Sequence, residues 1–482
     1  MRRLGQKYGH LAGPSGCACD GSAAVGLCER VGEGLSRRAV LAGIAASFAA
    51  LASPLPALAQ PGDRPLLLRG AKIFNGLSAQ PVEGRDLLIT GHAIVDLIPA
   101  GQAVADAIVL DCRRMTLIPG LIDAHWHTLL AAIPQLAAVT ADVPYVHLVA
   151  AQEAQRTLLR GFTTVRDVGG PAFALKRAID EGRFAGPRIY PSGAMISQTS
   201  GHGDFRMRSD LPRSPQSGLS PAERAGIAMI ADGETEVVRR VREQLMLGAS
   251  QIKIMAGGGV ASSYDPIDTL QYSEAEMRAA VGAAADWGTY VCAHVYTSSG
   301  IRRALAAGVR SIEHGQLADE ETVRMMAGAG AWWSIQPFLA DEDGNVYQNP
   351  EQQADQRKIA QGTERAFELG RKHKVRMAFG TDILFAPTRT ASQGRQLAKL
   401  ARWFEPAEVL RMATSHSGEL LAMSGARNPY SSRLGVLEKG ALADVVAVAG
   451  DPLADIGLIG DPDRNFRLIV KDGRIHKNTL TA

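Results

Sequence analysis

Several features that would point to other functions are missing from this 482-residue sequence. Acidic and basic residues are mixed along the chain and leave a formal net charge of only +3, and no block of lysine and arginine stands out. This pattern argues against an electrostatic nucleic-acid surface. The glycine run at residues 257–259 lacks the G-x-G-x-x-G spacing of a dinucleotide-binding turn, and no such turn follows a strand-like segment elsewhere.

Cysteine is also scarce, with five residues in the whole chain. Cys17, Cys19 and Cys28 lie near the N-terminus, which leaves Cys112 and Cys292 for the rest of the protein. These two could pair in an exported protein, but nothing in their spacing requires it.

The N-terminal 59 residues have the pattern of an export signal. Two adjacent arginines, Arg37 and Arg38, precede an apolar run over residues 39–52, and Ala57-Leu58-Ala59 matches an A-x-A cleavage site. The arginine pair resembles a twin-arginine signal. We therefore predict a periplasmic or secreted protein with residues 1–59 as its signal peptide and no membrane span after cleavage; an uncleaved anchor is the alternative.

The two ends of the remaining chain share a β-rich texture. Short apolar segments separated by Gly and Asp occur between residues 66 and 117, and similar segments return after residue 434. We expect residues 60–118 and 426–482 to pair as the two parts of one small β-sandwich.

The middle, residues 119–425, alternates short apolar segments with amphipathic helical patterns such as 234–247, 274–287 and 301–307. This alternation predicts an α/β fold, a (β/α)₈ TIM barrel; a doubly wound open sheet is the alternative. The strands are expected at 116–123, 163–168, 188–193, 251–255, 290–294, 311–314, 332–336 and 376–381.

Residue types that bind metals recur where these strands are expected to end, which is where the active sites of such barrels lie. His125 and His127 end the first strand, and residues two apart on a strand share a face. Lys253 lies within the fourth strand between two isoleucines, while His294, His314 and Asp382 end the fifth, sixth and eighth. Each residue alone also fits a structural role; their joint placement on five strands favours a metal site.

The order H-x-H, Lys, His, His, Asp resembles the binuclear branch of the amidohydrolase superfamily. The phrases that carry the resemblance are Leu117-Ile118-Pro119-Gly120-Leu121-Ile122-Asp123-Ala124-His125-Trp126-His127, Ser311-Ile312-Glu313-His314-Gly315, Phe379-Gly380-Thr381-Asp382 and Gly440-Ala441-Leu442-Ala443-Asp444. The resemblance covers essentially everything from Arg64 to the C-terminus.

The resemblance implies two divalent metal ions, with Zn²⁺ the expected species and Mn²⁺ an alternative. His125, His127 and Asp382 would bind the more buried ion, and His294 and His314 the more exposed one. Lys253, carboxylated by CO₂, would bridge the two ions. Asp382 would also move the proton of the attacking water to the leaving nitrogen. Branches that deaminate or hydrolyse imidazolones generally lack this lysine, so its presence favours amide or ester hydrolysis with two metals.

A closer resemblance is to Xaa-Pro dipeptidases, arginine or lysine carboxypeptidases and ochratoxin-hydrolysing amidases. It rests on the segments 198–206, 255–260, 293–297 and 334–337. It implies a small amide or peptide substrate whose leaving amine carries a free carboxylate, and a homo-oligomeric enzyme. His202 would contact the scissile carbonyl and Tyr296 the carboxylate, with Arg206 and Tyr264 as further candidates.

Specificity is left open by the sequence. Hydrolysis of amides to C-terminal amino acids, including N-acyl amino acids such as ochratoxin, is the leading expectation. The alternatives are a cyclic amidohydrolase of the imidazolonepropionase or hydantoinase kind, a lactonase on the same metal frame, and a non-catalytic periplasmic binding protein. The aromatic residues that either line the pocket or fill the core are Trp126, Phe205, Trp332, Trp333, Phe338 and Phe385.

Overall fold

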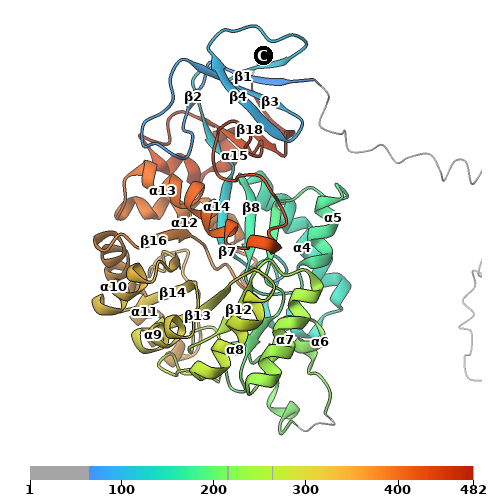
Figure 1. The fold of residues 1–482 in the computed structure, drawn as a ribbon, viewed down its shortest axis with the longest axis vertical. Coiled ribbons are helices and arrows are strands. Elements are labelled where there is room, and N and C mark those ends of the chain that lie inside the picture. The colour runs from blue at the N-terminus through green and yellow to red at the C-terminus, as the bar shows by residue number, and fades with distance from the viewer. Residues whose placement is uncertain (1–63, 214–216, 263, 481–482) are drawn as a thin grey trace, which may run out of the picture. The chain divides into compact units, whose positions relative to one another are not determined.

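A computed structural model describes residues 64–213, 217–262 and 264–480, and all structural statements below concern that part of the chain (Figure 1). The described residues belong to one compact unit. The expected signal peptide lies outside the described residues and stays a prediction.

Two packed sheets from opposite ends of the chain form a β-sandwich. One sheet has the order β4-β3-β1-β5 and the other the order β19-β18-β17-β6-β2. Side chains from both sheets, among them Leu68, Leu87, Ala447 and Val470, share one core. The strands are β1 (Leu66–Arg69), β2 (Lys72–Ile73), β3 (Arg85–Thr90), β4 (Ala93–Pro99), β5 (Ile108–Asp111), β6 (Met115–Pro119), β17 (Val445–Ala449), β18 (Phe466–Lys471) and β19 (Arg474–Asn478). The expected pairing of the two ends is confirmed, because β17 runs antiparallel to β6.

The single strand expected over 116–123 is instead two strands in different sheets. β6 pairs with β17 in the sandwich, and β7 (Leu121–Trp126) pairs with β8 (Phe162–Asp167) in the next domain. The chain passes between them at Gly120, where a Cβ atom would lie 2.2 Å from Oγ1 of Thr163. Glycine at this crossing lets the two backbones approach closely.

Parallel strands form the predicted TIM barrel. They comprise a three-stranded sheet, β7-β8-β9, and a seven-stranded sheet in which β10-β12-β13-β14-β15-β16 follow one another and β11 (Ala228–Ile230) lies at the edge. The third barrel strand is divided into β9 (Arg188–Pro191) and β10 (Met195–Ser197), each belonging to one sheet. The remaining strands are β12 (Ile252–Met255), β13 (Val291–Thr297), β14 (Ser311–Leu317), β15 (Trp332–Ile335) and β16 (Arg376–Phe379).

The first and last barrel strands meet without a continuous ladder. The amide of Asp382 donates to the carbonyl oxygen of His125 at 2.8 Å. The Thr381 hydroxyl donates to the buried carboxylate of Asp123 at 2.7 Å. These bonds join the end of β16 to β7 and bring Asp382 beside His125.

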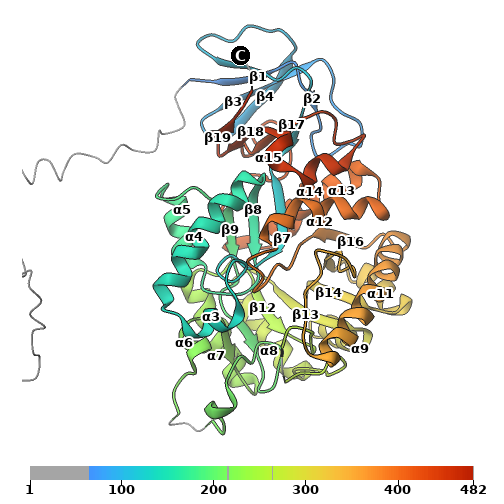
Figure 2. The same cartoon turned by 180° about the vertical axis from the view of Figure 1, so that it is seen from behind.

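Helices cover the outside of the barrel strands (Figures 1 and 2). The helix expected over 234–247 matches α7, which ends at Gly248 in a left-handed conformation that glycine adopts readily. None of the described helices is long and apolar enough to cross a membrane. The helices are α3 (Gln135–Thr140), α4 (Val143–Leu159), α5 (Phe173–Asp180), α6 (Pro221–Arg224), α7 (Glu234–Leu247), α8 (Glu274–Ala285), α9 (Ser298–Ala306), α10 (Glu320–Gly328), α11 (Pro350–Lys372), α12 (Gln393–Ala398), α13 (Pro406–Met412), α14 (Ser415–Ala422) and α15 (Pro462–Asn465).

Strand alternation decides which side chains face the inside of the barrel. Ile252 and Ile254 are fully buried in the same core cluster as Val241 of α7 and Ala280 of α8. Because successive strand residues point to opposite faces, Lys253 between the isoleucines faces the interior. The fold thus places an amine on the inner surface of the barrel.

Candidate metal centre and substrate pocket

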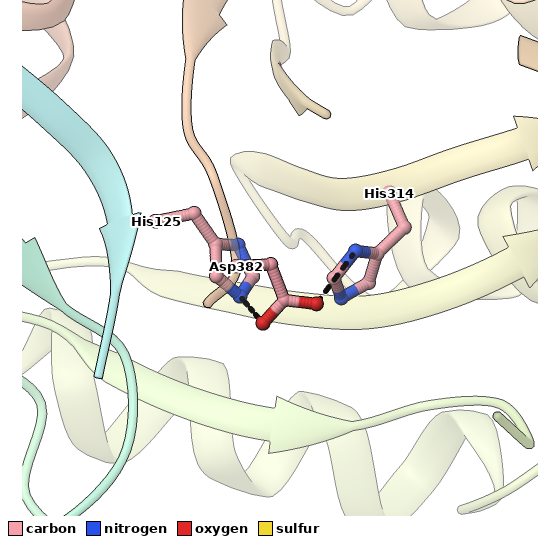
Figure 3. Close-up of side chains that lie close together, drawn as sticks. All are labelled: His125, His314 and Asp382. Atoms are coloured by element: carbon pink, nitrogen blue, oxygen red, sulfur yellow. Dashed lines mark ion pairs between the residues drawn. The ribbon is translucent and has the colours of Figure 1, made fainter. Parts of the chain in front are cut away.

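The six residues expected to bind metal converge on one place in the structure. One atom each from His125, His314 and Asp382 lies within 4.8 Å of the others, and Figure 3 shows the Asp382 carboxylate between the two imidazoles. Nε2 of His127 lies 3.2 Å from Oδ1 of Asp382.

Lys253 and His294 complete this group. The ammonium nitrogen of Lys253 is 3.5 Å from Nε2 of His125. The His294 ring centroid is 4.5 Å from that of His314. Both residues are far from His125 in the sequence: Lys253, the nearer of the two, follows it by 128 residues.

Two of the strand ends expected from the sequence are wrong. His294 and His314 are each the fourth residue of a seven-residue strand, because β13 and β14 continue to Thr297 and Leu317. These last two residues pair with each other beyond a register shift. His314 lies at this irregularity with φ of +73°, a left-handed conformation that costs a residue other than glycine about 1–3 kcal/mol. The Trp333 indole supports it by donating to the His314 carbonyl oxygen at 2.6 Å.

Each imidazole is oriented through one of its nitrogens. Nδ1 of His127 donates to the Gly169 carbonyl oxygen at 3.1 Å. Nε2 of His294 donates to the Gly258 carbonyl oxygen at 3.2 Å, and Nδ1 of His314 to the Gln336 side chain at 2.8 Å. Such partners fix the tautomer and leave the other nitrogen as a lone-pair donor, which is how histidine ligands are held in metal sites.

His125 has a charged partner instead. Its Nδ1 lies 2.7 Å from Oε2 of Glu313, and both oxygens of that carboxylate accept from Nη2 of Arg166 at 2.7 Å. Burial acts to raise the pKa of Glu313, but Arg166 and His125 outweigh it and hold the pKa well below its usual value. The carboxylate is therefore ionised and can orient His125.

The charges of the ligand candidates suit cation binding. Burial acts to raise the pKa of Asp382, but His125, His127 and His314 outweigh burial and hold the pKa well below its usual value. Burial lowers the pKa values of His294 and His314 well below their usual value, which keeps both imidazoles neutral. An ionised carboxylate and neutral imidazoles are the forms that bind Zn²⁺.

Lys253 is buried, with 1% of its surface exposed, and it has no carboxylate partner among the described residues. Burial lowers its pKa, an effect that Glu313 opposes. An unpaired buried ammonium is costly, whereas a neutral amine can react with CO₂ to give an oxygen ligand. The donor set therefore fits a pair of divalent ions bridged by a modified lysine.

The metal-ligand candidates form the floor of a pocket. Its walls include apolar side chains from the loops after β12, β15 and β16, among them Val260, Phe338, Tyr347 and Leu384, and Ile359 from helix α11. Of the six aromatic residues named from the sequence, Phe205 and Phe338 line the pocket and Phe385 does not. Trp126, Trp332 and Trp333 are instead buried in core clusters.

His202 and Tyr296 both face this pocket. The His202 ring stacks on His294 with centroids 3.9 Å apart, and its Nδ1 lies 2.9 Å from Oδ2 of the buried Asp265. Burial and the nearby Asp382 raise the pKa of Tyr296 well above its usual value, so the hydroxyl keeps its proton. This hydroxyl makes no hydrogen bond with the described residues and is available to a ligand.

Arg206 and Tyr264 do not line the pocket. Arg206 donates from Nε at 2.7 Å and from Nη2 at 2.6 Å to the carboxylate of Asp204. The Tyr264 hydroxyl donates to the backbone of Arg206 at 3.1 Å. These two side chains brace the loop after β10.

Cys112 and Cys292 are both buried and free.

Barrel, sandwich and converging ligands together define a TIM-barrel hydrolase with a candidate metal centre. The chain belongs to the amidohydrolase family, whose sequence profile matches residues 116–476. The prediction of an amidohydrolase-class enzyme is thereby confirmed.

Three known proteins show how close the similarity is. Ochratoxinase from Aspergillus niger is 33% identical over 329 residues, which span 66% of this chain and 66% of that protein. A crystal structure of a prolidase complexed with N-methylphosphonate-L-proline is 35% identical with a TM-score of 0.79, covering 86% of this chain and 100% of that one. A Xaa-Pro dipeptidase with methionine bound in its active site is 28% identical with a TM-score of 0.73, at the same coverage.

Proposed function

We propose that this protein is a two-metal amidohydrolase that cleaves the amide bond to a C-terminal apolar amino acid. The observation that carries the proposal is the convergence of four imidazoles, Asp382 and an unpaired buried lysine on the floor of one pocket. His125, His127 and Asp382 would hold one ion, His294 and His314 the other, and carboxylated Lys253 would lie between them. When bound, two such ions, with zinc our expectation, supply Lewis acidity and make water a nucleophile at neutral pH.

The protein's own side chains have separate tasks in this reaction. The oxygen of water adds to the amide carbon and the C–N bond breaks. The ionised Asp382 accepts the proton of the water and passes it to the leaving nitrogen. When protonated beside Asp265, His202 can donate from Nε2 to the carbonyl oxygen as negative charge develops on it.

The charge distribution of the pocket supports an uncharged side chain on the leaving amino acid. Asp341 and Asp343 line the pocket, but Nζ of Lys399 lies 2.7 Å and 2.6 Å from their carboxylates, and Arg395 contacts Asp343 at 2.8 Å. Burial acts to raise the pKa of Asp343, but Arg395 and Lys399 outweigh it and lower the pKa. Carboxylates that are already paired attract a basic side chain weakly, whereas the apolar walls favour an apolar one.

The comparisons point to the same substrate class. Methionine and N-methylphosphonate-L-proline, which occupy the two solved relatives, both carry an apolar side chain and a free carboxylate. Ochratoxinase is named for an N-acyl amino acid substrate.

A substrate panel on zinc-loaded protein tests the proposal. N-acyl derivatives of phenylalanine, leucine, methionine and proline should release free amino acid faster than those of arginine and lysine. Hydantoins and lactones should react slowly. Faster turnover of the cyclic substrates, without release of amino acids from the acyl series, would replace the proposal with the cyclic-amidohydrolase or lactonase alternative.

A further inference from the structure

Arg389 lies at the rim of the pocket, seven residues after Asp382 in the loop that follows β16. The loop is pinned to the loop after β7, because the amides of Phe385 and Ala386 donate to the carbonyl oxygens of Leu130 and Ala131 at 2.9 Å and 3.1 Å. Arg389 in turn donates its own amide to the Ala386 carbonyl oxygen at 2.9 Å. The backbone of Arg389 is therefore held at a fixed position relative to the metal-ligand candidate Asp382.

The guanidinium of Arg389 has no carboxylate partner among the described residues. It donates instead to the backbone oxygen of Asp343 and to the side-chain oxygen of Asn345. The nearby carboxylates of Asp341 and Asp343 are already paired with Lys399 and Arg395. These two carboxylates therefore have ion-pair partners of their own, and Arg389 forms no ion pair among the described residues.

This charge is partly withdrawn from water. Arg389 is half-buried, and burial lowers its pKa, an effect that Tyr347, Asp382 and Asp343 oppose. A desolvated guanidinium without a counterion is unfavourable, and its forked donors match a carboxylate.

We propose that Arg389 binds the free carboxylate of the leaving amino acid, together with the hydroxyl of Tyr296. The inference rests on the proposed function for the identity of the substrate, and it adds the residue that selects a free carboxylate over a neutral end. Tyr296 supplies a hydroxyl group from β13 beside the metal-ligand candidates, and Arg389 supplies a guanidinium from the loop after β16. A peptide that continues past the leaving residue, or a leaving residue with an amidated end, would lack the anion that both donors require.

The competing role for Arg389 is a brace between the loops after β15 and β16, since its partners Asp343 and Asn345 lie in the former. A brace would affect all substrates alike, whereas a carboxylate site affects only those with a carboxylate. The substrate pair N-acetyl-L-phenylalanine and N-acetyl-L-phenylalaninamide separates the two roles, because both contain the same acetyl amide bond.

The experiment compares wild type, Arg389→Met, Arg389→Lys and the matched control Arg402→Met, whose exposed side chain pairs with Glu364 away from the pocket. We expect Arg389→Met to lower kcat/KM for the carboxylate by about 10- to 100-fold, with little change for the carboxamide. Arg389→Lys should fall between, and Arg402→Met should match wild type. Equal losses on both substrates in Arg389→Met would overturn the proposal in favour of the brace.

Calorimetric binding of L-phenylalanine and L-phenylalaninamide to the zinc-loaded proteins keeps this test independent of turnover. Wild type should bind the carboxylate more tightly, and Arg389→Met should lose that preference. If the preference depends on Arg389 but no acyl amino acid is hydrolysed, the inference stands and the proposed function fails. If hydrolysis occurs but the preference survives in Arg389→Met, or if wild type binds neither compound, the inference fails.

Discussion

Nδ1 of His125 lies 2.7 Å from the carboxylate of Glu313, and Arg166 contacts the same carboxylate at 2.7 Å. All three side chains are at most 1% exposed. The Ser311 hydroxyl donates to the other carboxylate oxygen at 2.6 Å. A buried ion pair thus sets the orientation of a candidate ligand that does not itself belong to the pair.

Glu313→Gln should weaken metal binding. The amide cannot hold His125 as an ionised acceptor does, and loss of such outer partners costs about 10- to 100-fold in metal affinity. Competition with a zinc chelator measures the change, and Ser311→Ala, which keeps the Glu313 charge, is the matched control. Unchanged zinc affinity in Glu313→Gln would show that His125 is oriented by other contacts.

The same substitution should also destabilise the fold, because it leaves the buried Arg166 without its counterion. The expected cost is about 3–5 kcal/mol in the free energy of unfolding, measured by urea denaturation. The double variant Arg166→Met, Glu313→Gln should recover stability but not metal affinity. Joint recovery of both would mean that the metal effect was only a consequence of instability.

Lys253→Ala should abolish activity and reduce bound metal, since no other residue of the site replaces a bridging carbamate. Lys253→Arg retains a long positive side chain but cannot be carboxylated, so it should lose activity to the same extent. Metal content by elemental analysis, with a ¹³C carbamate signal from labelled bicarbonate in wild type only, checks the cause. Near-native turnover in either variant contradicts the bridging role.

Much of the architecture could be predicted because it depends on local periodicity. Helix α7 matches its expected bounds, since Gly233 and Gly248 flank an amphipathic run. The single strand expected over residues 116–123 could not be divided from the sequence, because Leu117 and Leu121 look alike and only the close approach of Gly120 to Thr163 marks the passage between their sheets. Strand lengths at His294 and His314 depend on pairing between β13 and β14, which no single segment reveals.

The site was predictable where a histidine or lysine stands in or directly after an otherwise apolar strand segment. His125, His127 and Lys253 belong to this class. Glu313 was missed because alternation puts it and His314 on opposite faces of a regular strand. The left-handed conformation of His314 disrupts that alternation. Arg389 lies in an irregular loop without any period, and only the pairing of the neighbouring acids makes its charge stand out.

Metal-free protein should lose stability as the pH falls from 7 to 5. Burial holds the pKa values of His294 and His314 well below that of unfolded histidine, which is about 6.5. Below pH 6.5 the unfolded chain therefore binds protons that the folded chain does not, and stability falls by about 1.4 kcal/mol per pH unit for each such histidine.

Urea unfolding of chelator-treated protein at several pH values measures this slope. His294→Gln should flatten it, whereas His92→Gln, which removes an exposed histidine, should not. A slope that is the same in all three proteins would show that these ligand candidates do not control the acid sensitivity.

Asp382→Asn should spare the fold but reduce turnover. The amide keeps the size of the side chain, and the backbone amide at this position still donates to the His125 carbonyl oxygen, so the junction of β16 and β7 should persist. The ionised carboxylate, however, is both a ligand candidate and the proposed proton carrier. Loss of the proton transfer alone costs about 10²- to 10⁴-fold in kcat.

Asp268→Asn, at an exposed position outside the pocket, is the control. Circular dichroism, metal content and kcat for an N-acyl amino acid should separate the effects. Full metal occupancy with a large fall in kcat would support proton transfer by Asp382. Full metal occupancy with unchanged kcat would show that Asp382 does not carry the proton.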